Sequence, residues 1–208
     1  MTLPFPKRGG GGKQPGAGRH RTRPHPGLLG PGVPHLEREK FASVRAVHVT
    51  QRVRPDAGYL RKQGPAAVLQ QAFRDASDRL GMRIAHYSIQ GNHLHLVVEA
   101  DDSAALTKGM QGLSIRVARR LNARLQRSGP IFADRYHAHI LTSRRAVANA
   151  VRYVVGNYRR HTREHLPAGF RDPLATRTER PLAEPRSWLL RAGWLLEPPR
   201  SPRPFEPP

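Results

Sequence analysis

Hydrophobic positions recur with two different periods through the middle of the chain, and these periods predict its first elements. β-branched residues fill positions 44–53, which predicts a strand. Apolar residues return at helical spacing from Ala66 to Leu80, which predicts a helix. Two further strands, Ile84 to Ile89 and His93 to Glu99, are expected on either side of Gln90-Gly91-Asn92, a sequence typical of a tight hairpin turn.

The same reasoning predicts a helix, a strand and a final helix in the second half. Ala104 to Leu125 has an apolar stripe of helical period, and Ile131 to Leu141 is strand-like. Ser143 is a suitable N-cap for a last helix that runs to about Arg160. The order β-α-β-β-α-β-α predicts an α+β fold: a ferredoxin-like, RRM-like antiparallel sheet with helices on one face, plus a C-terminal helix.

Proline and glycine mark the borders of this domain. Of the 20 prolines, 17 lie in residues 1–34 or 167–208. Segments of that composition bury too little apolar surface to offset the entropy of ordering them. We therefore predict a disordered basic arm over residues 1–40, a domain over 41–165, and a proline-rich tail over 166–208. The apolar residues around 187–195 are expected to dock on the domain.

The charge balance points to a nucleic-acid partner. Lys and Arg total 36 against 15 acidic residues, a formal net charge of +21, and only five of the cations are lysines. The planar guanidinium group of arginine can donate two parallel hydrogen bonds to a phosphate and can stack on bases. Arg116, Arg119 and Arg120 lie to one side of the predicted helix 104–125, so we expect them to face DNA.

Three absences narrow the class of protein further. The sequence has no cysteine, which excludes disulfides and thiolate metal sites. It has no apolar run of the roughly 18 residues that a membrane span needs, and no secretory signal at its start. We therefore expect a cytoplasmic protein without a membrane partner.

Two histidine pairs have the spacing of metal ligands. In a strand, His93 and His95 project from the same face, so both imidazoles can meet one divalent cation. His137 and His139 have the same spacing. Either pair can instead be two half-buried polar residues, and spacing alone does not decide between these interpretations.

The final helix supplies a second group of candidates. Its apolar stripe includes Val151, Val154 and Tyr158, so Tyr158 is predicted to lie in the core. Tyr153 and Asn157 are four residues apart and share one edge of an ideal helix. That arrangement puts a hydroxyl nucleophile beside an amide oxygen; the alternative is an exposed pair on a surface helix.

Four segments, in this order and spacing, resemble the REP-associated tyrosine transposases, which are HUH enzymes related to the single-tyrosine transposases of small bacterial insertion sequences. The segments are GNHLHLVVE (91–99), GMQGLSIRVARRLN (109–122), FADRYHAHIL (132–141) and RYVVGNYRRH (152–161). The resemblance extends from about Ala46 to His161, over more than half of the chain, and leaves the proline-rich tails unexplained.

This resemblance implies a role for each candidate. His93 and His95 would bind Mg²⁺ or Mn²⁺ together with Asn157, and Tyr153 would be the nucleophile. His137 and His139 have no counterpart in the catalytic set. The implied reaction is cleavage and rejoining of single-stranded or hairpin DNA, from palindromic repeat elements, through a 5′-phosphotyrosine. It implies a bacterial, nucleoid-associated protein, and leaves both a monomer and a homodimer open.

Two departures from the family pattern leave other functions open. The family often has Met-Pro-Asn before the first histidine, where this chain has Gln90-Gly91-Asn92, and Asn-Pro where it has Asn157-Tyr158. Glu99 lies on the same strand face as the histidine pair and is a candidate supporting group. The alternative functions are a domesticated protein that binds nucleic acid without cutting it, and a phosphodiesterase that uses metal-activated water.

Overall fold

The computed structural model describes residues 38–162 and 165–198, so most of the predicted basic arm lies outside the described residues. The strands are β1 (Arg45–Arg52), β2 (Asp78–Arg79), β3 (Met82–Ile89), β4 (His93–Ala100) and β5 (His137–Leu141). The helices are α1 (Gln63–Asp75), α2 (Ser103–Arg124), α3 (Arg144–Val155), α4 (Asn157–His161) and α5 (Trp188–Arg191), with 3₁₀ turns η1 (Pro55–Ala57) and η2 (Gly193–Leu196).

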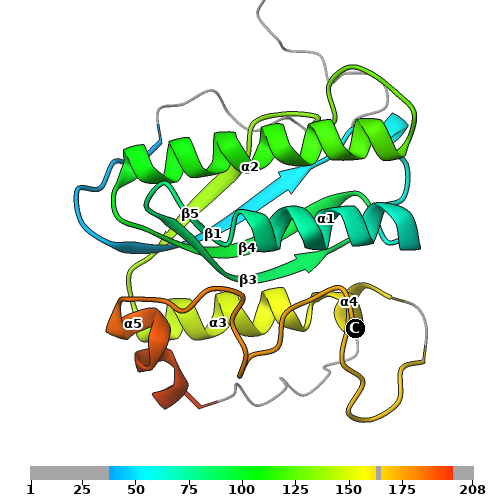
Figure 1. The fold of residues 1–208 in the computed structure, drawn as a ribbon. Helices are drawn as coiled ribbons and strands as arrows, with labels where there is room; N and C mark the ends of the chain where they lie inside the picture. Colours follow the sequence, from blue (N-terminus) through cyan, green and yellow to red (C-terminus); the bar gives the residue numbers. More distant parts are fainter. Residues whose placement is uncertain (1–37, 163–164, 199–208) are drawn as a thin grey trace, which may run out of the picture.

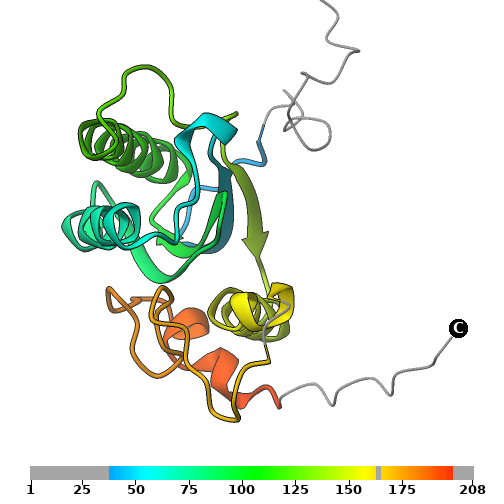
Figure 2. The ribbon, with the colours of Figure 1, turned by 90° about the vertical axis from the view of Figure 1, so that its right-hand side faces the viewer.

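The five strands form one antiparallel sheet in the order β2-β3-β4-β1-β5. Helices α1 and α2 lie side by side over one face of it (Figures 1 and 2). Each of these helices connects two strands that have another strand between them, which is the ferredoxin-like arrangement. The predicted α+β fold class is confirmed.

The main core lies between the sheet and these two helices. Leu94, Leu96 and Val98 point from β4 to this face, as the alternation predicted, and pack with the buried stripe of α2. Fully burying each such side chain contributes about 1.5–3 kcal/mol. Asp102 caps α2 by accepting a hydrogen bond from the Ala105 N–H at 2.7 Å. No helix in the described part of the chain is long and apolar enough to cross a membrane.

The predicted end of the first helix and the predicted start of the last strand were wrong. The first helix ends at Asp75 instead of Leu80, because Asp78 and Arg79 pair with the start of β3 in a hairpin. Leu80 and Gly81 form its turn, with φ values of 57° and 74° that no helix can contain. The strand predicted from Ile131 begins only at His137.

The second face of the sheet is half covered by α3 and the C-terminal segment. Ala46, Ala85 and Val97 face this layer and are buried against Val151 and its neighbours on α3. Leu190 of α5 and Trp194 of η2 complete the same cluster. Figure 2 shows α3 and α5 on the side of the sheet away from α1 and α2. This layer therefore covers only part of the second face, and a cavity lies beside it at the His93 end of β4.

β2 pairs only with the first two residues of β3, and residues 174–183 run along the rest of that strand edge. The Ile89 N–H donates to the Leu174 carbonyl at 2.9 Å, and the Thr176 N–H donates to the Tyr87 carbonyl at 3.0 Å. Further along, the Leu182 N–H donates to the Ala85 carbonyl at 2.8 Å. These bonds satisfy backbone groups that an exposed edge strand would present to solvent or to another chain.

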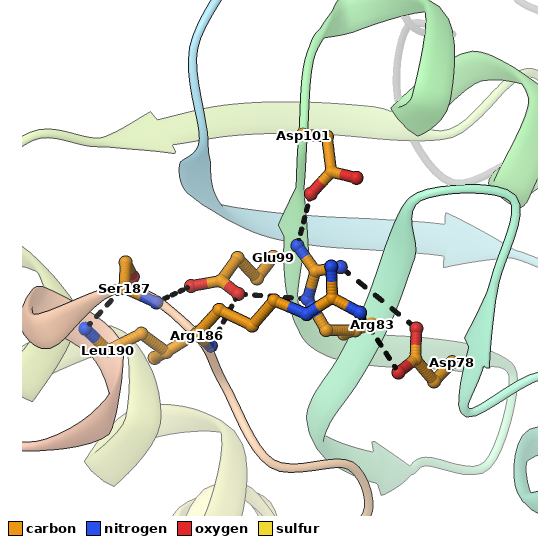
Figure 3. A network of polar contacts seen from close by, with 7 residues as sticks. All are labelled: Asp78, Arg83, Glu99, Asp101, Arg186, Ser187 and Leu190. Carbon is orange, nitrogen blue, oxygen red and sulfur yellow. Dashed lines mark hydrogen bonds and ion pairs between the residues drawn. The ribbon is translucent and has the colours of Figure 1, made fainter.

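Glu99 fastens the C-terminal segment to the sheet (Figure 3). It is fully buried and pairs with Arg83, whose Nε lies 2.9 Å from Glu99 Oε2. The backbone N–H groups of Arg186 and Ser187 each donate to this carboxylate at 2.8 Å. Arg83 also pairs with Asp101. Both oxygens of Glu99 are thus occupied by these structural contacts.

Replacing Glu99 by Gln is expected to lower the free energy of unfolding by about 3–5 kcal/mol, because Arg83 loses a buried partner. Burial raises the pKa of Glu99, but hydrogen bonds from Ser187, Arg186 and Arg83 outweigh it and hold the pKa below its ordinary value. The carboxylate's contribution is therefore present above pH 4.5 and is lost on further acidification.

Urea unfolding at pH 7 and at pH 3.5 measures both effects. The wild-type protein should lose more stability between these two pH values than Glu99→Gln does. Equal losses in the two proteins, or an unchanged midpoint for the variant at pH 7, would show that the Glu99 contacts contribute little.

Candidate active site

His93 and His95 open β4 at the uncovered end of the second face. The alternation of the strand places both rings on one side, and their Nε2 atoms lie 3.0 Å apart. His95 is 5% exposed, whereas His93 is more accessible. The strand register pairs His93 with Arg52 and His95 with Thr50 of β1.

The other ring nitrogen of each histidine is held by a neighbour. His93 Nδ1 lies 2.8 Å from Asn92 Oδ1, an acceptor that favours the Nδ1–H tautomer. His95 Nδ1 lies 3.1 Å from Thr50 Oγ1 and 3.3 Å from His48 Nε2. Contacts of this kind fix the orientation of a ring and direct the lone pair of its Nε2 toward a bound cation.

Tyr153 lies on α3 against this histidine pair. Its ring centroid is 5.2 Å from that of His95 and 5.9 Å from that of His48, and both contacts are edge-on. Tyr153 is partly buried against the hydrophobic cluster of α3, and it also lines the cavity in front of the histidines. Three of the four predicted site residues, His93, His95 and Tyr153, are thus brought together.

The fourth predicted residue, Asn157, follows a break in the final helix. Sequence periodicity predicted one helix to about Arg160, but α3 ends at Val155 and α4 starts after Gly156. Asn157 is fully buried, and neither its amide nitrogen nor its amide oxygen has a hydrogen-bond partner among the described residues. It does not line the cavity. A buried amide without partners is costly, so this side chain is suited to an additional ligand.

The break also corrects the prediction for Tyr158. With the helix interrupted at Gly156, Tyr158 no longer follows the apolar stripe of α3. It is half-buried and lines the cavity, with the Arg61 guanidinium stacked 3.7 Å from its ring centroid. Tyr158 and Tyr153 therefore border the same cavity.

The cavity in front of these residues has a volume of about 660 Å³. Both histidines, Thr50, Tyr153 and Tyr158 line it. Arg52, Tyr59 and Arg61 line it as well, and sequence reasoning missed all three. A second cavity of about 600 Å³ lies between the end of α3 and residues 169–179, and it contacts none of the histidines.

A family model described as "Transposase IS200 like" matches residues 43–157, more than half of the chain. The chain belongs to the IS200-like transposase family. This match spans β1 to the first residue of α4 and includes all four predicted site residues. Membership indicates a DNA-processing protein with a transposase-type DNA-binding function. No curated protein matches the chain.

Two solved structures are similar to this chain. One, described as a REP-associated tyrosine transposase bound to a REP hairpin, is 12% identical with a TM-score of 0.53, and the match covers 69% of this chain and 82% of that one. A second, described as a transposase from Deinococcus radiodurans R1, is 15% identical with a TM-score of 0.40, covering 55% of this chain and 87% of that one. At this identity the first likeness shows a shared fold.

In this IS200-like transposase the predicted DNA-facing arginines lie away from the cavity. Arg116, Arg119 and Arg120 are on α2, which covers the opposite face of the sheet from the histidine pair. Arg120 is paired with Asp75 of α1 at 2.5 Å. The structure does not bring these arginines to the site, and their contact with DNA stays a prediction.

Two other arginines, Arg52 and Arg61, line the cavity. Arg52 lies beside His93 across the β1–β4 ladder. Arg61 makes two hydrogen bonds to Asp172, at 2.8 and 3.0 Å, and a third to the Ile89 carbonyl at 2.6 Å. The contact between Arg61 and Asp172 links the C-terminal segment to the cavity wall. The sequence gives little indication that Arg52 and Arg61 lie at the cavity, because the chain contains many other arginines.

The second histidine pair does not line the cavity, although it lies on the strand next to Thr50 and His48. His137 and His139 are exposed on β5, where they pair across the ladder with Thr50 and His48. Among residues 38–162 and 165–198, no group of three or more His, Asp or Glu side chains is placed to hold a metal ion. A cation at His93 and His95 would therefore need other ligands, such as the Asn157 amide or phosphate oxygens.

The half-buried His48 and the buried His86 are both neutral at neutral pH. Burial, followed by the charges of His139 and His137, lowers the pKa of His48 to about 4. Burial alone lowers the pKa of His86 to about 4; its ring packs against Trp194. In the unfolded chain both groups would take up protons near pH 6.5. The unfolded state then binds more protons than the folded state, so acidification destabilises the fold.

We expect the free energy of unfolding to fall between pH 6.5 and pH 4.5 by about 1.4 kcal/mol per pH unit for each of these histidines. His86→Gln should show a clearly shallower decline, because one of the two groups is gone. Chemical unfolding at half-unit pH steps measures the slope. A flat profile across this range, or equal slopes for the two proteins, would contradict the assignment.

Proposed function

We propose that this transposase family member is a metal-dependent endonuclease and strand transferase. It acts on single-stranded or hairpin DNA, and Tyr153 forms a 5′-phosphotyrosine intermediate. The observation that carries the proposal is the placement of Tyr153 beside the His93–His95 pair, at one cavity, in a chain of this family. A tyrosine beside two imidazoles fits covalent phosphoryl transfer assisted by a cation.

His93, His95 and Asn157 would hold Mg²⁺ or Mn²⁺. The two facing Nε2 atoms and the unsatisfied amide of Asn157 are the features that fit such an ion. When bound, the ion would polarise the scissile phosphate and stabilise its developing charge. Two nitrogens and one amide oxygen bind hard cations weakly, so the affinity should be modest and phosphate oxygens should complete the coordination.

The chain's own residues account for the covalent steps. The Tyr153 oxygen attacks the scissile phosphorus, an O–P bond forms, and the P–O3′ bond breaks. The tyrosine hydroxyl gives up its proton, the departing oxygen gains one, and the strand is released with a free 3′-OH. Because the phosphodiester is exchanged for a phosphotyrosine ester, a 3′-OH can reverse the reaction without an added energy source.

The choice of DNA follows from accessibility and charge. In-line attack needs a phosphate that can enter the cavity. This requirement favours an unpaired strand or the base of a hairpin stem. Arg52 beside His93 is placed to neutralise that phosphate, and the net charge of +21 adds attraction to any polyanion. The hairpin bound by the structural neighbour supports palindromic repeat elements as the substrate. We expect the protein at the bacterial nucleoid, as a monomer or a homodimer.

Tyr153→Phe should abolish covalent attachment to DNA, because phenylalanine has no nucleophile, and should leave binding unchanged. The matched control is Tyr158→Phe, which removes a second tyrosine hydroxyl from the cavity and should still form the adduct. Hairpin DNA from the protein's own genomic flanks, labelled at either end, is incubated with Mn²⁺ and separated on denaturing protein gels. The label should remain on the protein only when it is on the 3′-side fragment.

Other results would change the proposed function. Binding without an adduct in the wild-type protein, across several flanking sequences, would indicate the domesticated binding protein. Cleavage that survives Tyr153→Phe without any adduct would indicate hydrolysis by metal-activated water.

Thr50→Val should weaken Mn²⁺ binding by about 10- to 100-fold, because His95 loses the hydroxyl that orients its ring. Thr50→Ser keeps the oxygen and should retain most of the affinity. Titration calorimetry, or the Mn²⁺ electron paramagnetic resonance signal, gives the dissociation constants. If the valine variant binds Mn²⁺ as the wild type does, Thr50 does not support a metal ligand.

A further inference from the structure

We propose that Tyr59 is a stacking platform for one unpaired base next to the scissile phosphate. This inference rests on the proposed function and adds to it a base-recognition site. Tyr59 is outside the predicted catalytic set, and it comes from the loop between β1 and α1. The ring lines the same cavity as His93.

Tyr59 is unusually exposed for an aromatic residue. Its exposed fraction is 51%, and among the described residues only Trp188 is another aromatic with comparable exposure. Trp188 is on α5, away from the histidine pair. An exposed aromatic ring at the mouth of a site for single-stranded DNA offers a face on which any base can stack.

The ring is held against the hairpin that precedes β4. A Cβ atom placed on Gly91 would lie 2.5 Å from Tyr59 Cε2, so the ring packs directly on the glycine backbone. Any side chain at position 91 would push the ring away from its present place. Because Tyr59 is exposed at its outer end, this displacement would move the ring without disturbing the core.

The backbone around Tyr59 is fixed on both sides. The Leu60 N–H donates to the Gly91 carbonyl at 2.8 Å, and Leu60 itself is fully buried. The Val53 N–H donates to the Asn92 carbonyl at 3.0 Å, where the loop leaves β1. A ring that is already positioned loses little conformational entropy when a base binds, which favours affinity.

The surrounding groups suit a nucleotide whose phosphate lies at the histidines. Arg52 supplies a cation beside His93, on the phosphate side of the cavity. Tyr158, the other candidate for stacking, already has the Arg61 guanidinium over its ring at 3.7 Å. Tyr59 is therefore the better platform. In a duplex each base is stacked on its neighbours, so this contact selects for an unpaired nucleotide.

The test uses the full chain and a hairpin with a single-stranded flank that carries one 2-aminopurine at successive positions. Binding is measured in EDTA, so that the DNA stays intact. In the wild-type protein, fluorescence should be quenched at one flank position. Tyr59→Phe should retain that quench, and Tyr59→Ala should lose it and bind about 10-fold more weakly, within the roughly 5- to 150-fold range for one stacked base.

Two further variants test whether the effect depends on the position of the Tyr59 ring and on this aromatic residue in particular. Gly91→Ala keeps the tyrosine but displaces its ring, so it should also reduce the quench. Trp188→Ala removes a comparably exposed aromatic away from the cavity and should change neither the quench nor the affinity. Absence of a quench in the wild type, or wild-type behaviour of Tyr59→Ala, would overturn the proposal.

The test of the Tyr59 stacking site can fail or succeed independently of the test for the Tyr153 adduct. If the wild type forms the Tyr153 adduct but Tyr59→Ala binds DNA normally, only the stacking site fails. If the quench depends on Tyr59 but no adduct forms with Mn²⁺, the stacking site stands and the cleavage chemistry fails.

Discussion

The packing of α3 against the second face of the sheet determines where the tyrosine lies. Small residues, Ala46 and Ala85, face α3 and allow it to approach the strands closely, and Val151 fills the interface. The same helix presents Tyr153 to the histidines at the uncovered end of that face. Loss of this contact would separate the proposed nucleophile from the proposed metal ligands while leaving the main core on the other face intact.

The C-terminal segment supports this arrangement from outside. Glu99 binds the backbone that leads into α5, Arg61 binds Asp172, and Arg152 of α3 donates to the Glu197 carbonyl. These contacts join the sheet, the cavity wall and the tyrosine helix to one stretch of chain. A proline-rich composition therefore does not prevent this segment from ordering, because side chains and strand edges elsewhere satisfy its backbone.

Much of the fold follows from local patterns, since strand alternation and helical periodicity are strong in the central domain. The histidine pair was predictable because side chains two apart in a strand share a face. The break at Gly156 was not, because the apolar period continues through it, and so Tyr158 was wrongly placed in the core. Arg52 and Tyr59 were missed because their position depends on strand register and loop packing, which one sequence does not reveal.

The central claim is that Tyr153, and not the neighbouring Tyr158, becomes joined to DNA. The most direct measurement is peptide mass spectrometry of the protein after reaction with Mn²⁺ and a short hairpin substrate, followed by nuclease digestion. The account predicts a nucleotide attached through its 5′-phosphate to the peptide that contains Tyr153, with fragment ions that assign it to this residue. A nucleotide on Tyr158, or DNA cleavage with no modified tyrosine at all, would contradict it.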